Sequence, residues 1–427
     1  MDVVYQQCCG LDVHKKSVVA CLLTSPSVGE VVRTVRTFGT MTEDLLALSD
    51  WLAAANCTHV AMESTGVYWK PIWNLLEDDF SLLLVNPRDI KAVPGRKTDI
   101  TDAEWIADLL RHGLLRASYV PDRPQRELRE LTRYRTSLVR ERTAQANRLQ
   151  KTLEGANIKL ASVATDILGT SGREMLQALV AGATDAAALA HLAKGRLREK
   201  IPELERALTG KVTPHQRFMV AEHLAHIDFL EASIERVNEE IAERLQPSAE
   251  AVARLDTIPG IGPYLAEALI AEIGTDMSRF PTPAHLASWA GMCPGNHESA
   301  GKRRSGRTRK GSPWLRTLLV QAAHAGARKK DTYLGAQYRR LAARRGKSRA
   351  AVAVGHTILV IVYHVLRDGP VSHDLGPHDF DERDRRAVER RLVHRLEGLS
   401  SMVSLTPAAE RLAGIAYFQT KLAHYRN

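Results

Sequence analysis

The sequence predicts an α/β domain followed by mostly helical domains, and three observations carry that prediction. Strand and helix signals alternate over residues 1–118, with two strands coming first. Beyond residue 119, long stretches follow a helical period. The chain has 427 residues and 44% hydrophobic side chains, enough for two or three domains with their own cores.

Strand-like and helix-like runs alternate in the α/β part. Residues 3–13 and 17–23 flank the short polar turn His14-Lys15-Lys16 and predict a hairpin. Thr42 is placed as the N-cap of the first helix. The remaining elements expected are strands over 31–38, 58–62 and 81–85, helices over 42–55 and 67–76, and a further helix near Asp99. A hairpin-led sheet followed by alternating strands and helices is the order of an RNase H-like domain.

Four carboxylates fall at positions where this fold would let them converge. Asp12 is in the first strand, and Glu63 ends a later one. Asp99 and Asp102 are three residues apart at a helix start, so they share a face. Carboxylate oxygens are ligands for Mg²⁺, and two such ions roughly 3.5–4 Å apart can neutralise a reacting phosphodiester. Each acid alone is more simply a cap or a solvated strand end, but the four together predict a magnesium site.

The first hairpin also allows a different class of enzyme. Residues 10–17 fit the phosphate loop of sugar kinases and actin-like ATPases. That class predicts a second, duplicated hairpin domain with another Asp-Gly turn. The chain turns helical instead, which favours the RNase H-like alternative.

Residues 119–250 form the second predicted region, with long helices over 122–155 and 215–246. In the second of these helices, apolar residues follow the three-four spacing of a heptad: Ile227, Leu230, Ile234, Val237 and Ile241. The pair predicts either a protruding antiparallel coiled coil or two helices of an ordinary bundle. Either would serve as a dimerisation element.

A third region, residues 251–367, begins with a turn of the helix-hairpin-helix kind at 257–266. In such a turn the amides of Gly260 and Gly262 face a DNA phosphate. The long apolar run over 350–366 is interrupted by glycine and histidine, so it predicts a buried helix and not a membrane span. Residues 368–427 are a mixed-charge extension whose role the sequence does not indicate.

A glycine- and arginine-rich loop follows Pro294 and cannot pack a core. Ser299 and Ser305 lie in it, and a serine becomes a nucleophile when a base, a metal or a strongly electropositive site activates it. From the residues alone, a serine that only hydrogen-bonds in a flexible loop is the simpler interpretation. The side chains placed to grip phosphates are Lys302, Arg303, Arg304, Arg307, Arg309 and Lys310.

Charge and cysteine content narrow the setting. A formal net charge of +10 favours a polyanionic partner, with nucleic acid ahead of an acidic membrane surface. Five cysteines without paired spacing indicate neither a disulfide framework nor a zinc site. The N-terminus lacks the pattern of a signal peptide. We therefore expect a cytoplasmic, nucleoid-associated protein without a membrane partner.

Several motifs together resemble the Asp-Glu-Asp-Asp transposases of the insertion-sequence 110 family. In the first part these are Gly10-Leu11-Asp12-Val13-His14-Lys15, Met62-Glu63-Ser64-Thr65-Gly66, Val85-Asn86-Pro87 and Lys97-Thr98-Asp99-Ile100-Thr101-Asp102. In the second part they are Ile258-Pro259-Gly260-Ile261-Gly262, residues 286–294, Ser299-Ala300-Gly301 and residues 310–316. The resemblance covers roughly residues 8–366.

The resemblance implies an N-terminal RuvC-like domain, a coiled-coil linker and a C-terminal domain that supplies a catalytic serine. The Mg²⁺ ligands carry over to Asp12, Glu63, Asp99 and Asp102. The serine carries over to Ser299, with Ser305 in reserve. Family members are DNA recombinases that act on element ends and targets. Several are guided by a structured bridge RNA and assemble as dimers that pair into tetramers.

One departure from the family is Ser312-Pro313, where Gly-Asn is usual. Proline fits the first turn of a helix, so we expect little damage from this change.

The predicted function is therefore a Mg²⁺-dependent DNA transposase in which Ser299 forms a phosphoserine intermediate. Two alternatives stay open from the sequence. One is a metal-dependent nuclease or resolvase that uses water and in which the serines are structural. The other is a non-catalytic protein that binds nucleic acid through the helix-hairpin-helix turn and the arginine loop.

Overall fold

The computed structural model describes most of the chain. The described residues are 3–25, 31–87, 90, 102–295, 297–299, 301–306, 308, 310–369, 371–399 and 402–404, with the backbone alone for 297–299 and 303–305. The chain divides into two compact units, Met1–Glu127 and Leu128–Asn427. The four predicted domains, 1–118, 119–250, 251–367 and 368–427, stay a finer prediction than this division.

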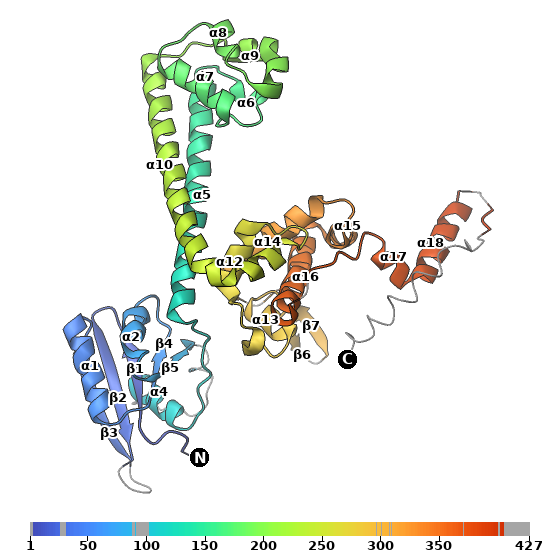
Figure 1. The fold of residues 1–427 in the computed structure, drawn as a ribbon. Coiled ribbons are helices and arrows are strands. Elements are labelled where there is room, and N and C mark those ends of the chain that lie inside the picture. Colours follow the sequence, from blue (N-terminus) through green and yellow to red (C-terminus); the bar gives the residue numbers. More distant parts are fainter. Residues whose placement is uncertain are drawn as a thin grey trace. The chain divides into compact units, whose positions relative to one another are not determined.

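The first unit is built on one mixed five-stranded sheet (Figure 1). Its strand order is β3-β2-β1-β4-β5. Strand β2 runs antiparallel to its neighbours β1 and β3, whereas β4 is parallel to β1 and β5 is parallel to β4. This arrangement is compatible with the predicted RNase H-like fold. The strands are β1 (Cys8–Val13), β2 (Ser17–Thr24), β3 (Val32–Gly39), β4 (His59–Glu63) and β5 (Ser81–Val85).

The sequence predicted all five strands, and its main error is at the start of the first. Residues 3–7 are not part of β1. The amides of Val4 and Tyr5 instead donate to the carbonyl of Arg111, so this segment runs to the end of a helix. The N-cap of the first helix is Met41 and not Thr42, because the amide of Met41 is bound by the carboxylate of Asp44 at 3.3 Å.

Helices cover both faces of this sheet. On one face α1 (Thr42–Ala54) and α2 (Trp69–Leu76) pack against apolar side chains of β1, β2 and β4. On the other face α4 (Asp102–Arg111) lies across β1, β2 and β4. The side chains of Ile106 and Leu110 are among the most buried in the chain.

Gly10 sets how closely α4 approaches the sheet. A Cβ atom at this position would lie 2.4 Å from the carbonyl oxygen of Ala103 and 2.4 Å from the amide nitrogen of Ala107. Any other side chain would therefore push α4 off β1.

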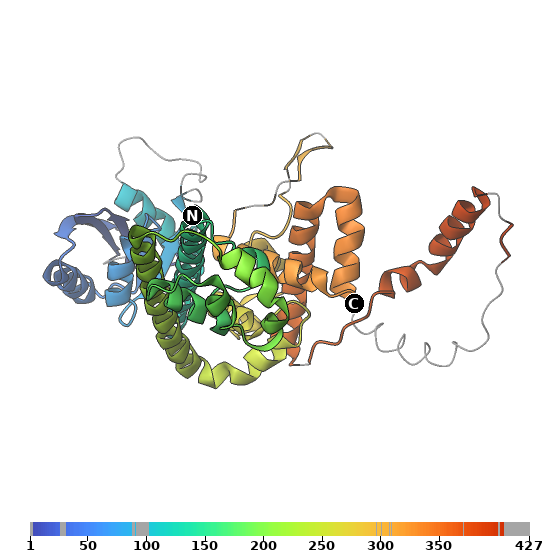
Figure 2. The same cartoon turned by 90° about the horizontal axis from the view of Figure 1, so that it is seen from above.

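In the second unit, two long helices run side by side in opposite directions (Figures 1 and 2). They are α5 (Arg123–Gly155), which begins in the first unit, and α10 (Pro214–Leu245). Arg142 donates to Glu231 at 2.8 Å, and Gln145 meets His226 at 2.7 Å. The antiparallel pairing is thus as predicted, whereas the supercoil of a coiled coil stays a prediction.

The turn between these long helices carries a small helical core of its own. Leu160, Met175, Leu204 and Ile227 are fully buried within it. Its elements are α6 (Leu160–Val163), α7 (Thr170–Val180), α8 (Ala186–Ala190), the 3₁₀ helix η1 (Gly195–Lys200) and α9 (Ile201–Leu208).

The described residues in the rest of the second unit are helical apart from one short hairpin. Its elements are η2 (Gln246–Ser248), α11 (Ala249–Asp256), α12 (Pro263–Ile273), η3 (Met277–Arg279), α13 (Pro283–Trp289), β6 (His297–Ser299), β7 (Lys302–Ser305), α14 (Pro313–Arg328), α15 (Tyr333–Arg345), α16 (Lys347–Asp368), α17 (Asp379–Arg383) and α18 (Arg385–Glu397).

The helix α16 is central to the core of this part. Within the described ranges it is one helix whose length and hydropathy would suffice to cross a membrane, and 56% of that window is buried inside the protein. Ile358 and Val362 are fully buried against α13 and α14 residues. The apolar run therefore forms a core helix, as predicted.

The five cysteines are free, and four of them are buried. Burial raises the pKa of Cys8 and of Cys57 to about 12. These thiols therefore stay protonated at neutral pH.

Candidate active site

Asp12 faces the helix α4. Side chains alternate along a strand, so Asp12 points the same way as Cys8 and Gly10. Cys8 donates through its thiol to the carbonyl of Ala107, and Gly10 touches α4 directly. The side chain of Asp12 therefore emerges on the α4 side of the sheet.

Glu63 lies on the neighbouring strand at the same edge of the sheet. Leu11 on β1 is aligned with Met62 on the parallel strand β4, so the next residues along, Asp12 and Glu63, are neighbours. Ala61, two residues before Glu63, packs against α4. Parallel strands end at a common edge, which explains why two acids 51 positions apart in sequence come together.

Asp102 completes the group as the first residue of α4. Asp12, Glu63 and Asp102 line one cavity of about 220 Å³, together with Val13, His14, Thr65, Ile90 and Ile106. Because Gly10 lets α4 lie directly on β1, Asp102 reaches the edge where the two strands end. Three of the four predicted acids thus line the same cavity, while their role as metal ligands stays a prediction. Asp99 lies outside the described residues.

A histidine and a threonine contact the two strand acids. Nε2 of His14 is 3.2 Å from Oδ2 of Asp12, and Oγ1 of Thr65 donates to Oε1 of Glu63 at 3.3 Å. Neither residue was predicted from the sequence. The only signal was a polar residue two positions after each acid, which is too common to indicate a site.

The donor chemistry of this cavity suits a hard divalent cation, since carboxylate oxygens surround it. Among the described residues, however, no group of three or more His, Cys, Asp or Glu is arranged so as to hold a metal ion. Asp12, Glu63 and Asp102 therefore line one cavity, but their carboxylates are not close enough together to coordinate an ion. A bound cation would have to draw their carboxylates together.

The two candidate serines lie at opposite ends of the β6–β7 hairpin. Ser299 is paired with Lys302 across the two-residue turn, whereas Ser305 is paired with His297 at the other end. Gly301 adopts a φ of +72°, a conformation that favours glycine in such a turn. The backbone therefore presents Ser299 at the tip and Ser305 at the base.

The base of this hairpin is tied to the helical core. Pro294 and Thr308 form an isolated antiparallel bridge, and Nη1 of Arg316 donates to Oγ1 of Thr308 at 2.6 Å. Gly311 packs so tightly that a Cβ atom would lie 2.4 Å from backbone atoms of Ala290. The hairpin thus leaves the core at fixed points.

Ser312 and Pro313, the departure from the family pattern, start α14 without strain. Oγ of Ser312 accepts from the amide of Leu315 at 3.3 Å, and Pro313 occupies the first turn. Ser312 also donates to Oε2 of Glu272 at 3.4 Å. The expectation of little damage is therefore supported by a good N-cap.

Glu272 is a buried acid, only 2% exposed, near the end of the mostly apolar helix α12, which also contains Glu267. Arg133 of α5 binds it with both arms of its fork, Nε to Oε1 at 2.7 Å and Nη2 to Oε2 at 2.9 Å. Arg129 donates to the carbonyl oxygens of Ala271 and Glu272. This cluster joins α5, α12 and the start of α14.

The turn between α11 and α12 has two glycines with different surroundings. Gly260, at φ +100°, lies against α14, where a Cβ atom would be 2.4 Å from the carbonyl oxygen of Ala322. Gly262 is the N-cap of α12 and has open space around it. Gly260 therefore has a packing role that the sequence did not predict, and the phosphate contacts of both glycines stay predictions.

The basic loop residues fall partly outside the described side chains. Lys302 and Lys310 are exposed. The side chains of Arg303 and Arg304, and the whole of Arg307 and Arg309, lie outside the described residues. Their phosphate contacts stay predictions.

Comparisons with known proteins agree with this geometry. A family model described as "Transposase", of the DEDD type of IS110 elements, matches residues 9–158, and one described as "Transposase IS116/IS110/IS902 family" matches residues 252–339. The first match spans the sheet and its acids, and the second spans the hairpin with its serines.

Three curated relatives have similar sequences. A probable family 20 transposase of Pseudomonas aeruginosa is 30% identical over 275 residues, 63% of this chain and 71% of that protein. A putative transposase of Sinorhizobium fredii, y4qE, is 27% identical over 314 residues, 67% of this chain and 69% of that protein. The transposase for insertion sequence element IS1328 of Yersinia enterocolitica is 25% identical over 280 residues, 65% and 73% of the two chains.

An acid-bearing mixed sheet joined to a helical domain with a serine hairpin is therefore the architecture of a transposase, an enzyme that acts on DNA. The chain belongs to the IS110/IS116/IS902 family of insertion-sequence transposases. This membership removes the kinase-like and the non-catalytic alternatives.

Proposed function

We propose that this transposase cuts and rejoins DNA through a serine-phosphate intermediate with Mg²⁺ as its cofactor. The observation that carries the proposal is the cavity lined by Asp12, Glu63 and Asp102. We assign Asp99 as the fourth ligand from the family resemblance. When bound, Mg²⁺ supplies the positive charge that offsets the negative charge developing on the phosphate.

The protein groups have distinct tasks in this reaction. His14 and Thr65 hold the carboxylates of Asp12 and Glu63 in their orientation. The hydroxyl of Ser299 gives up its proton as its oxygen forms a bond to phosphorus, the bond to the leaving DNA oxygen breaks, and the leaving oxygen takes up a proton. Attack by a hydroxyl of another DNA end reverses these steps, rejoins the strand and frees the serine.

Ser299 is the preferred nucleophile because of its place at the hairpin tip. A tip residue can approach a phosphate without the core following it, whereas Ser305 is paired at the base. Lys302, directly opposite Ser299, and the neighbouring residues Arg303, Arg304, Arg307, Arg309 and Lys310 hold the DNA backbone.

The decisive experiment compares Ser299→Ala with Ser305→Ala in a cleavage assay on element-end DNA. We expect Ser299→Ala to abolish covalent protein–DNA adducts, and Ser305→Ala to retain them. EDTA should stop adduct formation by the wild type, and added Mg²⁺ should restore it. Adducts that persist in Ser299→Ala would show that Ser299 is not the nucleophile.

The same assay tests the second candidate, a resolvase-type nuclease that uses water. Its favouring observation is that the acid cavity and the serine hairpin belong to different compact units. If water is the nucleophile, the DNA is cut without covalent adducts, and Ser299→Ala does not change cleavage.

We further propose that a structured bridge RNA guides the enzyme to its target, and that dimers pair into tetramers at the nucleoid in the cytoplasm. The long antiparallel helices α5 and α10 are a suitable dimerisation element. Since serine and acids belong to different units, assembly is the step that would bring both to one phosphate. The guide can be tested by sequencing RNA that stays bound to the purified protein. The proposal expects this RNA to come from a structured non-coding segment between the gene and an element end.

A further inference from the structure

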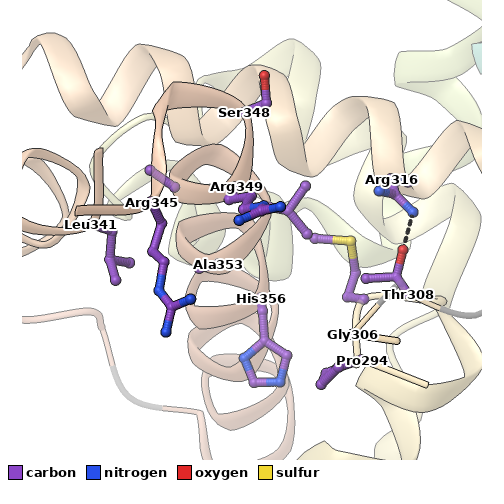
Figure 3. A pocket seen from close by; sticks show the side chains of 13 residues that line it. Pro294, Gly306, Thr308, Arg316, Leu341, Arg345, Ser348, Arg349, Ala353 and His356 are labelled. Carbon is purple, nitrogen blue, oxygen red and sulfur yellow. Dashed lines mark hydrogen bonds between the residues drawn. The ribbon is translucent and has the colours of Figure 1, made fainter. Parts of the chain in front are cut away.

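A cavity in the described part of the second unit lies beside the serine hairpin (Figure 3). It has a volume of about 1020 Å³ and is bounded by α15, α16 and the hairpin base. The residues that line it are Met292, Pro294, Gly306, Thr308, Arg316, Leu341, Arg345, Ser348, Arg349, Ala350, Val352, Ala353 and His356.

The rim of this cavity is cationic. Figure 3 shows Arg345 and Arg349 around the opening, at the junction of α15 and α16. Within the described ranges, their guanidinium groups are exposed and make no hydrogen bond or ion pair, so both are available to an anion. None of the described lining residues is acidic.

Arg316 differs from these two because its guanidinium group already donates a hydrogen bond to Oγ1 of Thr308, at 2.6 Å. Burial lowers the pKa of His356, so this histidine is neutral at pH 7 and offers hydrogen bonds instead of charge. The anion-binding capacity is therefore concentrated at Arg345 and Arg349.

Below the rim the wall is apolar. Met292, Leu341, Val352 and Ala353 contribute aliphatic surface. A duplex backbone presents phosphates on a convex surface and has no use for an apolar recess. A nucleotide outside a duplex needs both features, a cation for its phosphate and an apolar recess or guanidinium plane for its base.

The size of the cavity leads to the same class of ligand. Its volume is at the upper end of the roughly 300–1,000 Å³ typical of small-molecule sites. Such a cavity can take one or two nucleotides but cannot enclose a duplex. Thr308 and Gly306 place it directly against the hairpin that carries Ser299.

We propose that this cavity binds an unpaired nucleotide of the DNA strand that is being cut, with Arg345 and Arg349 on its phosphate and the aliphatic wall against its base. The proposal rests on the proposed function in one respect, that the strand held here is the one offered to Ser299. Its function is to hold an unstacked nucleotide at the base of the hairpin whose tip carries Ser299.

The test is equilibrium binding of the full-length protein to fluorescent oligonucleotides, in EDTA so that no strand is cut. The probes are a single-stranded DNA, its duplex and a single-stranded RNA of the same sequence. The variants are Arg345→Ala/Arg349→Ala, which removes the rim charges, and Ala353→Phe, which fills the recess. Arg344→Ala is the matched control, because Arg344 is an exposed arginine of α15 that does not line the cavity.

We expect the double arginine variant to bind single-stranded DNA about tenfold more weakly, and its salt dependence to flatten by about one unit of slope. We expect Ala353→Phe to weaken single-stranded binding about tenfold as well, while duplex binding stays within about twofold of the wild type. Arg344→Ala should stay within about twofold on every probe.

Unchanged single-stranded DNA binding in the double arginine variant overturns the proposal, and so does an equal loss in Arg344→Ala. A loss confined to single-stranded RNA also overturns it and identifies a site for RNA. If Ala353→Phe melts at a lower temperature than the wild type, its binding data are set aside. The double arginine variant and its control then decide between the outcomes, because their exposed side chains do not pack in the core.

Failure of this proposal and failure of the proposed function have different signatures. If only the cavity proposal fails, Ser299→Ala still abolishes adducts while the cavity variants bind like the wild type. If only the serine mechanism fails, the cavity variants still lose single-stranded binding while Ser299→Ala keeps its adducts.

Discussion

The acids of the first unit's cavity and the buried Glu272 of the second unit have opposite surroundings. Asp12 is contacted by a histidine and Glu63 by a threonine hydroxyl. Glu272 is held by both arms of Arg133, and the backbone of its own residue is held by Arg129. A carboxylate that is held by an arginine fork is saturated with donors.

The difference teaches how to separate structural acids from reactive ones in this protein. Glu272 stabilises the fold where α5, α12 and α14 meet. Asp12, Glu63 and Asp102 line a shared cavity, where we propose that they bind a cation. Substitutions of the two kinds should therefore affect different measurements.

The largest expected effect is on activity. Glu63→Gln should lower DNA cleavage on the order of a hundredfold or more, because it removes one charged ligand from the metal site. Its unfolding midpoint should match or exceed that of the wild type, since a like charge has left the cavity. Glu43→Gln, an exposed change in α1, is the control for both measurements. A Glu63→Gln enzyme that cleaves normally would show that this cavity is not the metal site.

The next effect is on stability. Glu272→Ala should lower the free energy of unfolding by about 3–5 kcal/mol, since it leaves Arg133 without its partner at a buried position. Denaturant unfolding of the full chain measures it. The control is Glu240→Ala, whose exposed pair with Arg244 should be worth about 0.5 kcal/mol or less. Equal losses in the two variants would remove the distinction between Glu272 and a surface acid.

A smaller effect is expected at Ser312. Ser312→Ala should cost about 1 kcal/mol through loss of the α14 N-cap. Thr282→Ala removes the equivalent cap from α13 and should cost a similar amount. Because Ser312 also contacts Glu272 and precedes α14 at the hairpin base, only Ser312→Ala should reduce adduct yield. A matching reduction in Thr282→Ala would contradict this link.

The smallest effect is on pH dependence, at a paired acid of the first unit. Burial alone would raise the pKa of Glu77, but hydrogen bonds from Arg126 and Arg123 outweigh it and keep the pKa below its ordinary value. A carboxylate with a lowered pKa stabilises the fold above the unfolded pKa near 4.5, and this contribution disappears as the pH falls through the folded value.

Urea unfolding of the wild type and of Glu77→Gln between pH 6 and pH 3 measures that contribution. The wild type should be more stable at pH 6, and the difference should shrink as the pH falls below 4.5. A difference that is constant over this range would mean that Glu77 does not titrate with folding.

Much of the first unit could be predicted from the sequence because its information is local. Strand-like runs predicted β1 to β5, and the places of Asp12 in the first strand and Glu63 at the end of a later one predicted that these acids come together. Met41 was missed as a cap because methionine has no capping oxygen, and the bond that fixes this helix start comes from Asp44.

The second unit was harder because its decisive contacts are distant in sequence. Glu272 appears in the sequence as one of two acids in a mostly apolar helix, and its partner Arg133 is 139 residues away. Arg345 and Arg349 look like part of a solvated basic run. Only the packing of α15 and α16 beside the hairpin shows that they border a cavity.

Gly10 has a consequence for any search of inactive variants. It carries no functional group, yet its missing side chain decides whether α4 can carry Asp102 to the edge where Asp12 and Glu63 stand. The distance between the acids thus depends on the absence of one methyl group. A search limited to residues with reactive groups would miss this position. A single added carbon there would move Asp102 away from Asp12 and Glu63 while leaving all three acids in place in the sequence.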